Sequence, residues 1–566
     1  MKSYDTHVHP VLQFPREGLN VLISRAMQAV LDKPACWFMA RTFLYREIHD
    51  MTQRFITFLQ ANGFKKGDVV AISLPNCPQY LVAHVATILA GGVSSGLSPL
   101  LSPDEVAYQV NDSGAKFLVT LDAVFEKVLT KILDKCPNLQ GVVVSNIADY
   151  MGFSPVKVAL GKALKKIPKG KVTPWPGKLV IGFRDVMKVS PNAMPVDIDP
   201  THDLVLLYYT GGTTGHPKGV ELTHANIIAN LIQVENWIDL ERGKDICLSA
   251  FPLFHLAGMF FCFYALFNSD SQILIPNPRD TDHLVNEWIA KRPTIIANVP
   301  SLYLMILNNP RAATIPRDVL DTVRIYVSGA APFPAELIRK FENAMHAENK
   351  LIEVYGMTET SPLITANPFK GKKKIGTVGL PLPNTVIRIL DLESGKPAPL
   401  GSPGEVTCKG PQVTRGYRNK PEETSTAIDE DGWLHTGDVG VMDEDGYITI
   451  VDRVKDMLIV SGYKVFSVHV EDILVKHPAI ELVAIIGLKD PERPGSEIVK
   501  AIIKLYAGYP APPETQDDIK KYAGEHLSKY ENPKIWEFRD EIPLTAVGKV
   551  DKKVLRAAAR QEQQLH

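Results

Sequence analysis

Residues 209–219 constrain this chain most. They read Tyr-Thr-Gly-Gly-Thr-Thr-Gly-His-Pro-Lys-Gly and follow an apolar, strand-like run at 204–209. Glycine lets the backbone turn tightly and present N–H groups to an anion, threonine hydroxyls add donors, and Lys218 adds a mobile positive charge. The run therefore predicts a strand followed by a phosphate-gripping loop. It is not a Walker loop, because Pro217 precedes the lysine and Gly219 follows it. A plain Gly/Thr-rich surface loop is the alternative.

Length and composition indicate a multidomain globular protein. A chain of 566 residues exceeds what one core supports, so at least two domains are expected. Its 45% hydrophobic and 22% charged residues are ordinary, and the net charge of −1 gives no signal for nucleic acid. The six cysteines lack CxxC spacing, so neither a zinc site nor a disulfide framework is indicated. Because the N-terminus also lacks the apolar core of a signal peptide, we expect a cytoplasmic protein.

Alternating periodicities predict an α/β fold. Helical spacing at 45–59 and 78–89 brackets a buried-strand run at 69–74, and Ser102 offers an N-cap for a further helix. Repeated strand–helix–strand units predict two mostly parallel, helix-covered sheets. Short strands and turns at 385–450 predict a small β-barrel-like subdomain, and the remaining segment, with two helix signals and several strands, predicts a compact α+β lid. The expected domains are 1–453 and 454–566.

Four more motifs follow the loop in a fixed order. They are Tyr355-Gly-Met-Thr-Glu-Thr360, Gly432-Trp-Leu-His-Thr-Gly-Asp438, Asp452-Arg-Val-Lys-Asp456 and Pro543-Leu-Thr-Ala-Val-Gly-Lys549. Together the five motifs resemble those of the adenylate-forming enzymes, which include acyl-CoA synthetases, luciferases and peptide-synthetase adenylation domains. Within that superfamily the chain is most similar to bacterial long-chain fatty acid–CoA ligases.

The resemblance implies a two-step reaction and a role for each motif. A carboxylic acid and ATP, with Mg²⁺, would form an acyl-adenylate and pyrophosphate, and coenzyme A would then give acyl-CoA and AMP. By this resemblance the phosphates of ATP are held by Thr210, Gly211, Gly212, Thr213, Thr214, Gly215 and Lys218. The adenosine is held by Gly329, Ala330, Ala331, Tyr355, Gly356, Asp438 and Arg453. The catalytic group comprises Lys549, Thr358, Glu359 and His255, with Glu359 as the Mg²⁺ ligand; Lys455 is the hinge, and Gly462 serves the coenzyme A step.

Two departures from the family pattern concern the second step and the acyl site. After Gly462 the family places a proline and a glutamate where this chain has Ser467 and His469, which puts the local geometry on the coenzyme A side in doubt. Some long-chain ligases gate their fatty-acid tunnel with a tryptophan four residues after the histidine of this motif. Here that position is Met259, a flexible thioether.

The acid is predicted from what the sequence lacks and from its apolar runs. Residues 254–256 offer no carboxylate to bind the ammonium of an amino acid. The runs 258–266 and 301–307 are suited to wall an apolar tunnel, or are plain core. Because each buried methylene contributes about 0.8 kcal/mol, a tunnel favours medium- or long-chain fatty acids. The alternatives are an aryl or alicyclic acid–CoA ligase, a ligase that delivers acyl-adenylate to an acyl carrier protein, and a nucleotide-binding protein without turnover.

Residues 156–178 differ in composition from the rest of the chain, because they contain seven lysines and no acidic residues. Apolar residues at helical spacing among them predict either a basic amphipathic helix at the inner face of the cell membrane or a solvated helix packed on its own domain. Other expected partners are the small-molecule substrates, without nucleic acid, and a homodimer is left open. The apolar stretch 251–267 is short for a membrane span and predicts a buried segment instead.

Overall fold

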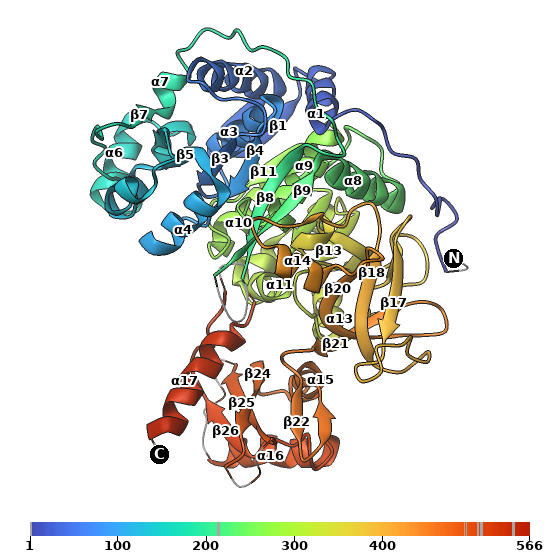
Figure 1. Ribbon diagram of the computed structural model, residues 1–566. Coiled ribbons are helices and arrows are strands. Elements are labelled where there is room, and N and C mark those ends of the chain that lie inside the picture. The colour runs from blue at the N-terminus through green and yellow to red at the C-terminus, as the bar shows by residue number, and fades with distance from the viewer. Residues whose placement is uncertain are drawn as a thin grey trace.

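The computed structural model describes residues 3–211, 216–491, 493, 495–506, 509, 513–545 and 549–565. Figure 1 shows a large body formed by the first four-fifths of the chain and a smaller C-terminal part below it. Two large sheets form the centre of the body, as predicted. None of the described helices has the length and the apolar character needed to cross a bilayer.

The first large sheet has eight strands, six of them parallel. Their order and bounds are β19 (Gly416–Tyr417), β9 (Lys218–Thr223), β8 (Leu204–Thr210), β4 (Val93–Gly96), β3 (Val69–Ser73), β5 (Ala115–Leu121), β6 (Gly141–Ser145) and β7 (Leu179–Gly182). Every residue of β3 is buried, as expected for a parallel strand covered on both faces. The antiparallel pair β8–β9 brings the two ends of the phosphate-loop motif together.

The second large sheet has nine strands and a parallel centre. Their order and bounds are β16 (Leu380–Pro381), β15 (Leu363–Ala366), β14 (Leu351–Gly356), β13 (Ile325–Ser328), β12 (Ile295–Asn298), β10 (Ile246–Ser249), β11 (Ser271–Leu274), β1 (Pro34–Phe38) and β2 (Arg41–Leu44). Because β13 and β14 are parallel neighbours, the residues that follow β13 lie beside the carboxyl end of β14. Ligands bind at such strand ends in open α/β sheets.

Helices of the body cover both sheets. Their bounds are α1 (Leu19–Gln28), α2 (Tyr45–Ala61), α3 (Pro78–Leu89), α4 (Pro103–Ser113), α5 (Asp122–Lys127), α6 (Pro155–Ala163), α7 (Phe183–Val186), α8 (His224–Ile238), α9 (Leu256–Phe267), α10 (Thr281–Lys291), α11 (Pro300–Leu307), α12 (Arg317–Leu320), α13 (Ala335–Met345) and α14 (Pro421–Ala427). Helix α4 begins where the sequence predicts: the Ser102 hydroxyl accepts from the Glu105 amide, and the Glu105 carboxylate accepts from the Ser102 amide.

The β-rich subdomain predicted at 385–450 is a four-stranded antiparallel sheet. It comprises β17 (Val386–Leu390), β18 (Gly404–Lys409), β20 (Leu434–Met442) and β21 (Ile448–Arg453). Strand β20 pairs with β21 so that Asp438 lies opposite Arg453. This register places two of the predicted nucleotide-binding residues side by side.

The C-terminal part has cores of its own. Its elements are β22 (Leu458–Val460), β23 (Tyr463–Val465), α15 (Ser467–Leu474), β24 (Ile480–Lys489), β25 (Glu497–Leu505), α16 (Pro513–His526), β26 (Ile535–Phe538) and α17 (Lys552–Leu565). The described residues here form three helices, one more than the sequence signals predicted. Strands β24 and β25 are buried on both faces, between clusters that include Leu474 and Ile503 on one side and Ile502 and Leu555 on the other.

Two segments refine the sequence predictions. The apolar stretch 251–267 contains α9, which is largely buried, as predicted. The lysine-rich helix is shorter than its spacing indicated, because α6 ends at Ala163 and Lys165 has a positive φ of 56°. Ile167, predicted on the same helical stripe as Val156, instead folds back and packs beside Gly161.

All six cysteines are buried thiols. Burial raises the pKa of each one, to about 12 for Cys77, Cys262 and Cys408. A thiol inside an apolar environment loses the hydration that stabilises its thiolate, so these side chains stay protonated at neutral pH.

Candidate functional site

The phosphate-loop motif connects two paired strands. Thr210, the last residue of β8, lies opposite Lys218, the first residue of β9, and Gly211 is exposed at the start of the loop. The predicted residues Gly212, Thr213, Thr214 and Gly215 lie outside the described residues. Beyond them, the His216 ring stacks on Tyr108 of α4 with ring centroids 4.5 Å apart, and the Tyr108 hydroxyl donates to the Pro217 carbonyl at 3.1 Å. Helix α4 therefore holds His216 and Pro217, the end of the loop that leads into β9.

A buried carboxylate faces this loop. Glu359 lies in the short 3₁₀ turn Thr358–Thr360 that follows β14, and only 5% of it is exposed. The Tyr417 hydroxyl donates to Glu359 Oε1 at 2.8 Å, and the Lys218 ammonium lies 4.9 Å from the centre of the Tyr417 ring. Desolvation raises the pKa of Glu359, while Tyr417, Arg453 and Lys218 oppose that rise. The carboxylate is thus held between two cations and one hydroxyl.

Small residues allow close backbone packing at the ends of β13 and β14. Gly329, Ala330 and Ala331 follow β13, and Ala330 has a left-handed φ of 69°. A Cβ on Gly329 would lie 2.8 Å from the Val354 side chain, and one on Gly356 would lie 1.9 Å from the Pro362 carbonyl oxygen. Glycine at 356 is therefore required by the close approach of the following backbone.

Asp438 links the end of β14 to the four-stranded antiparallel sheet. Tyr355 at the end of β14 donates its hydroxyl to Asp438 Oδ2 at 2.7 Å, and Arg453 Nε donates to Asp438 Oδ1 at 2.9 Å. Only 5% of Asp438 is exposed. The three residues come from β14, β20 and β21, and their contacts bring together groups that the sequence predicted for adenosine.

Lys549 reaches the same place from the C-terminal part. Its pKa is lowered to about 8 by burial, with Arg453 and Lys455 adding to the effect and Asp438 opposing it. Burial also lowers the pKa of His255 to about 3, and the neighbouring Lys549 contributes. His255 caps α9, where its Nδ1 accepts from the Ala257 amide at 3.3 Å. The predicted catalytic lysine and histidine are therefore neighbours, next to the Asp438–Arg453 pair.

The remaining two predicted residues lie at and beyond the connection to the C-terminal part. Lys455 follows β21, and burial followed by Arg453 lowers its pKa. Gly462 is the turn residue between β22 and β23 and has a φ of 85°, a conformation that favours glycine. In the segment that carries Lys549, the Thr545 amide donates to the Lys549 carbonyl.

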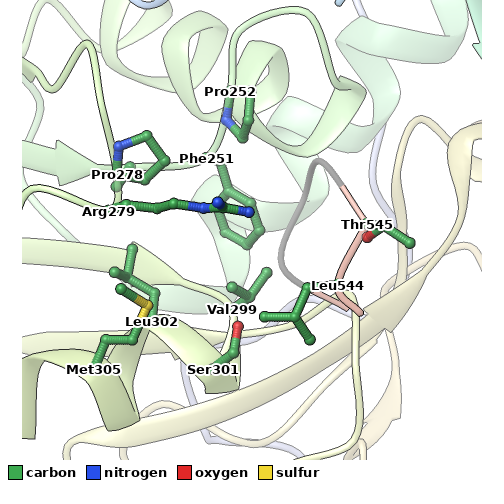
Figure 2. A pocket seen from close by; sticks show the side chains of 11 residues that line it. Phe251, Pro252, Pro278, Arg279, Val299, Ser301, Leu302, Met305, Leu544 and Thr545 are labelled. Atoms are coloured by element: carbon green, nitrogen blue, oxygen red, sulfur yellow. The ribbon is translucent and has the colours of Figure 1, made fainter. Parts of the chain in front are cut away.

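A small pocket of about 60 Å³ lies between the two parts of the chain (Figure 2). Residues of the body form most of it, and Leu544 and Thr545 close it from the C-terminal side. Figure 2 shows the Arg279 side chain extending across the pocket in front of Phe251, towards the segment that carries Thr545. The other lining residues are Ala250, Pro252, Pro278, Val299, Ser301, Leu302 and Met305.

A second, smaller pocket lies behind Phe251, which lines both. Gly258, Phe261 and Cys262 of α9 contribute to it. The two apolar runs proposed as tunnel walls thus each line a pocket on one side, while most of α9 is plain core. Met259 is fully buried.

Sequence reasoning missed two residues of this region. Tyr417 lies more than 50 residues from Glu359 along the chain. It reaches Glu359 through the pairing of β19 with β9, and no local sequence pattern predicts that pairing. Arg279 follows two prolines in a loop after β11, where a lone arginine gives no signal. Only the tertiary arrangement brings either side chain to the site.

Comparison with known proteins agrees with this arrangement. A family described as "AMP-binding enzyme" matches residues 23–418, and "AMP-binding enzyme C-terminal domain" matches residues 469–549. The long-chain-fatty-acid–CoA ligase of Bacillus subtilis (strain 168) is 34% identical over 556 residues, 97% of this chain and 96% of the relative. The 4-coumarate–CoA ligase 4 of Arabidopsis thaliana is 30% identical over 541 residues, 91% of this chain and 86% of the relative.

A solved structure with the same architecture is that of the anthranilate CoA ligase AuaEII in complex with anthranoyl-AMP. It superposes with a TM-score of 0.85 and covers 97% of this chain and 99% of its own, at 24% sequence identity. At that identity the likeness establishes the fold, which is the α/β body with a smaller C-terminal part that the sequence predicted.

The Glu359–Tyr417 contact generates a first prediction. Glu359→Gln should raise the Mg²⁺ concentration needed for half-maximal pyrophosphate release, because an amide oxygen is a poorer ligand for a hard cation than a carboxylate. Tyr417→Phe keeps the carboxylate and should have a smaller effect. The measurement is pyrophosphate release across a Mg²⁺ titration, with the exposed Glu444→Gln as the matched control. A Mg²⁺ dependence of Glu359→Gln equal to that of the control would remove Glu359 from this role.

The surroundings of Lys549 generate a second prediction. Lys549→Ala should lower the rate of pyrophosphate release by about 10²- to 10³-fold, as expected on losing one group that stabilises developing charge. Since the pKa of Lys549 in the free enzyme is about 8, wild-type kcat/KM for this half-reaction should fall above that pH as the ammonium is lost. Lys553→Ala, an exposed neighbour, should behave as wild type. Equal losses in both lysine variants would contradict the assignment.

Proposed function

Because the chain belongs to the AMP-binding enzyme family and is an AMP-forming acid–CoA ligase, we propose that its acid is a medium- or long-chain fatty acid. The reaction would convert the acid and ATP to acyl-adenylate and pyrophosphate, and then acyl-adenylate and coenzyme A to acyl-CoA and AMP. The proposal rests chiefly on one observation: Lys218, Glu359, Asp438, Arg453 and Lys549 are gathered around one space at the sheet ends.

The arrangement of charge suits attack by a carboxylate on the α-phosphate of ATP. Both reactants are anionic, so the enzyme must offset their repulsion as they approach. Lys549 is the cation best placed to do so, since it is half-buried and its neighbours include the Asp438–Arg453 pair. His255, which burial keeps neutral, would border the acyl carboxylate. Thr358 would donate to the α-phosphate from the turn that also carries Glu359.

Nucleotide recognition would use the wall at the ends of β13 and β14. Adenine would lie between the Gly329–Ala331 segment and Tyr355, at the adjacent carboxyl ends of β13 and β14. Asp438 would accept hydrogen bonds from the ribose hydroxyls, because a carboxylate is a natural acceptor for a vicinal diol, with Arg453 holding it in place. The residues 210–215 and Lys218 would bind the β- and γ-phosphates.

Mg²⁺ fits beside Glu359. Proteins bind this ion through one or two carboxylates together with phosphate oxygens of the substrate, and Glu359 supplies one buried carboxylate facing the loop. When bound there, the ion would neutralise charge on the phosphates and the departing pyrophosphate. Tyr417 orients the carboxylate through its hydroxyl hydrogen bond.

The pocket between the two parts of the chain is suited to admit coenzyme A. Arg279 offers a cation for an anionic group at its edge, and Leu544 and Thr545 form one wall. We infer domains at 1–453 and 454–566, with Lys455 as the hinge. A rotation of the lid about Lys455 would withdraw Lys549, open this pocket and present the face that carries Gly462. One lid would thus serve two steps.

A long acyl chain requires the described pockets to widen. A volume of about 60 Å³ is well below the roughly 300 Å³ or more of a typical small-molecule site, so side chains must move to admit a substrate. The flexible Met305, which lines the first pocket, suits such movement. Similarity to the B. subtilis long-chain-fatty-acid–CoA ligase supports a fatty acid as the substrate. Similarity to the Arabidopsis 4-coumarate–CoA ligase and to the solved anthranilate CoA ligase supports an aryl acid as the alternative.

A panel of acids tests the choice. Pyrophosphate and AMP release would be measured for straight-chain acids from acetate to oleate, and for benzoate and 4-coumarate, with and without coenzyme A. We expect kcat/KM to rise about four-fold per added methylene before it levels off, because each methylene contributes about 0.8 kcal/mol. AMP release should require coenzyme A. A maximum at an aryl acid would replace the fatty acid in the proposal.

We also propose that residues 156–178 contact an anionic lipid surface. Val156, Leu160 and Leu164 are 78%, 57% and 59% exposed, four residues apart along α6 and its cap. Lys157, Lys165, Lys166, Lys169 and Lys171 are exposed around them, and no ion pair is found for any of these lysines among the described residues. The combination of an exposed apolar stripe and cations without an ion pair is typical of an interfacial helix.

Vesicle binding tests this surface. Wild-type protein should co-sediment with anionic vesicles at low salt and dissociate as ionic strength rises, with each lysine near the surface contributing about 1 kcal/mol. Replacing Lys162, Lys165, Lys166 and Lys169 by glutamine should abolish binding and leave turnover of a medium-chain acid intact. The matched control replaces four exposed lysines of the C-terminal part: Lys521, Lys529, Lys534 and Lys553. Equal binding to neutral vesicles would return the segment to a solvated helix.

A further inference from the structure

Ser467 stands where the family pattern has proline, and it connects the two parts of the chain. It is fully buried and is the first residue of α15, which packs against β21. Its amide donates to Asp452 Oδ2, and its hydroxyl donates to Asp452 Oδ1 at 3.0 Å. Proline has no N–H and no hydroxyl, so neither of these hydrogen bonds could form with the family's usual residue.

Asp452 depends on these donors. It lies on β21, immediately before Arg453, and only 1% of it is exposed. Its other hydrogen-bond donor is the Arg453 amide, at 2.8 Å from Oδ1. A buried carboxylate that loses donors is costly, because it has already given up its hydration. Asp452 therefore holds the start of α15 against the strand that carries Arg453.

The same serine is linked to the segment that carries Lys549. Lys552, on the first turn of α17, donates to the Ser467 hydroxyl at 2.8 Å and pairs with Glu471 at 2.7 Å. Glu471 in turn accepts from the Ile485 amide of β24 at 2.6 Å. Lys552 follows Lys549 by three residues, so its position constrains where Lys549 lies.

We propose that Ser467 is a positioning residue that holds the lid in the arrangement in which Lys549 reaches the nucleotide site. The relay runs from Asp452 through Ser467 to Lys552. Because Asp452 precedes the hinge at Lys455 and the other two residues follow it, rotation of the lid breaks the relay. It therefore stabilises the adenylating arrangement and opposes the arrangement that completes the thioester. This inference rests on the proposed lid rotation.

A second contact between the two parts makes the lid position measurable. Lys464 of β23 pairs with Glu393 of the body at 2.9 Å, and the Glu393 side chain is 79% exposed. The six native cysteines are all buried. In a Glu393→Cys, Lys464→Cys background, the rate of cross-linking by a short bis-maleimide therefore reports how often the lid occupies the arrangement seen here.

Two variants of Ser467 remove the relay in steps. Ser467→Ala keeps the amide donor and loses the hydroxyl; Ser467→Pro loses both, and proline is well tolerated at the first position of a helix. Ser528→Ala is the matched control, because the Ser528 hydroxyl donates to Glu531 within the lid. Each variant would be assayed for cross-linking, for pyrophosphate release, and for thioester formation from synthetic acyl-adenylate and coenzyme A.

We expect cross-linking to slow by about ten-fold in Ser467→Ala, the effect of one hydrogen bond to a charged group, and further in Ser467→Pro. Pyrophosphate release should fall in the same order, whereas thioester formation should be unchanged or faster, and Ser528→Ala should match wild type. A purely structural role would lower both half-reactions together, and that result overturns the proposal. So do cross-linking rates equal to wild type in both Ser467 variants. If wild type itself released no pyrophosphate with any acid, the proposed function would fail while cross-linking still tested the relay.

Discussion

The carboxylate of Asp438 holds three strands in the arrangement on which the site depends. It accepts from Tyr355 at the end of β14 and from Arg453 at the end of β21, while its own strand, β20, pairs with β21. Two hydrogen bonds to a buried carboxylate each contribute more than a neutral pair does. Since Arg453 is the last residue of β21, the same carboxylate also anchors the strand from which the chain enters the C-terminal part.

Much of the fold is predictable because its signals are local. Helices α2 and α3 begin at the predicted residues, and α4 is defined by Ser102, Pro103 and Glu105, which cap it through contacts three residues apart. Helix α6 shows the limit of this reasoning. Its helical spacing continues to Ile167, but the backbone turns at Lys165 so that Ile167 can pack beside Gly161, and the periodicity cannot report that tertiary choice.

The site divides in the same way. Lys218, Glu359, Asp438, Arg453 and Lys549 stand in motifs whose order is visible in the sequence, and the structure brings their charges within reach of one another. Tyr417 and Arg279 have no such motif. Tyr417 reaches Glu359 because β19 pairs with β9, strands separated by about 200 residues, and that pairing depends on the packing of the whole sheet. The centre of the phosphate loop, residues 212–215, lies outside the described residues and remains a prediction from the sequence alone.

The burial of all six cysteines has a consequence for a reaction that ends in a thioester. An acyl-adenylate is an acylating agent and reacts with any thiolate within reach, including one belonging to the enzyme. Here Cys247 and Cys262 line the small pocket behind Phe251, yet burial keeps both thiols protonated. The protein therefore resists acylating itself, and its own cysteine thiols do not compete with the thiol of coenzyme A for the acyl group.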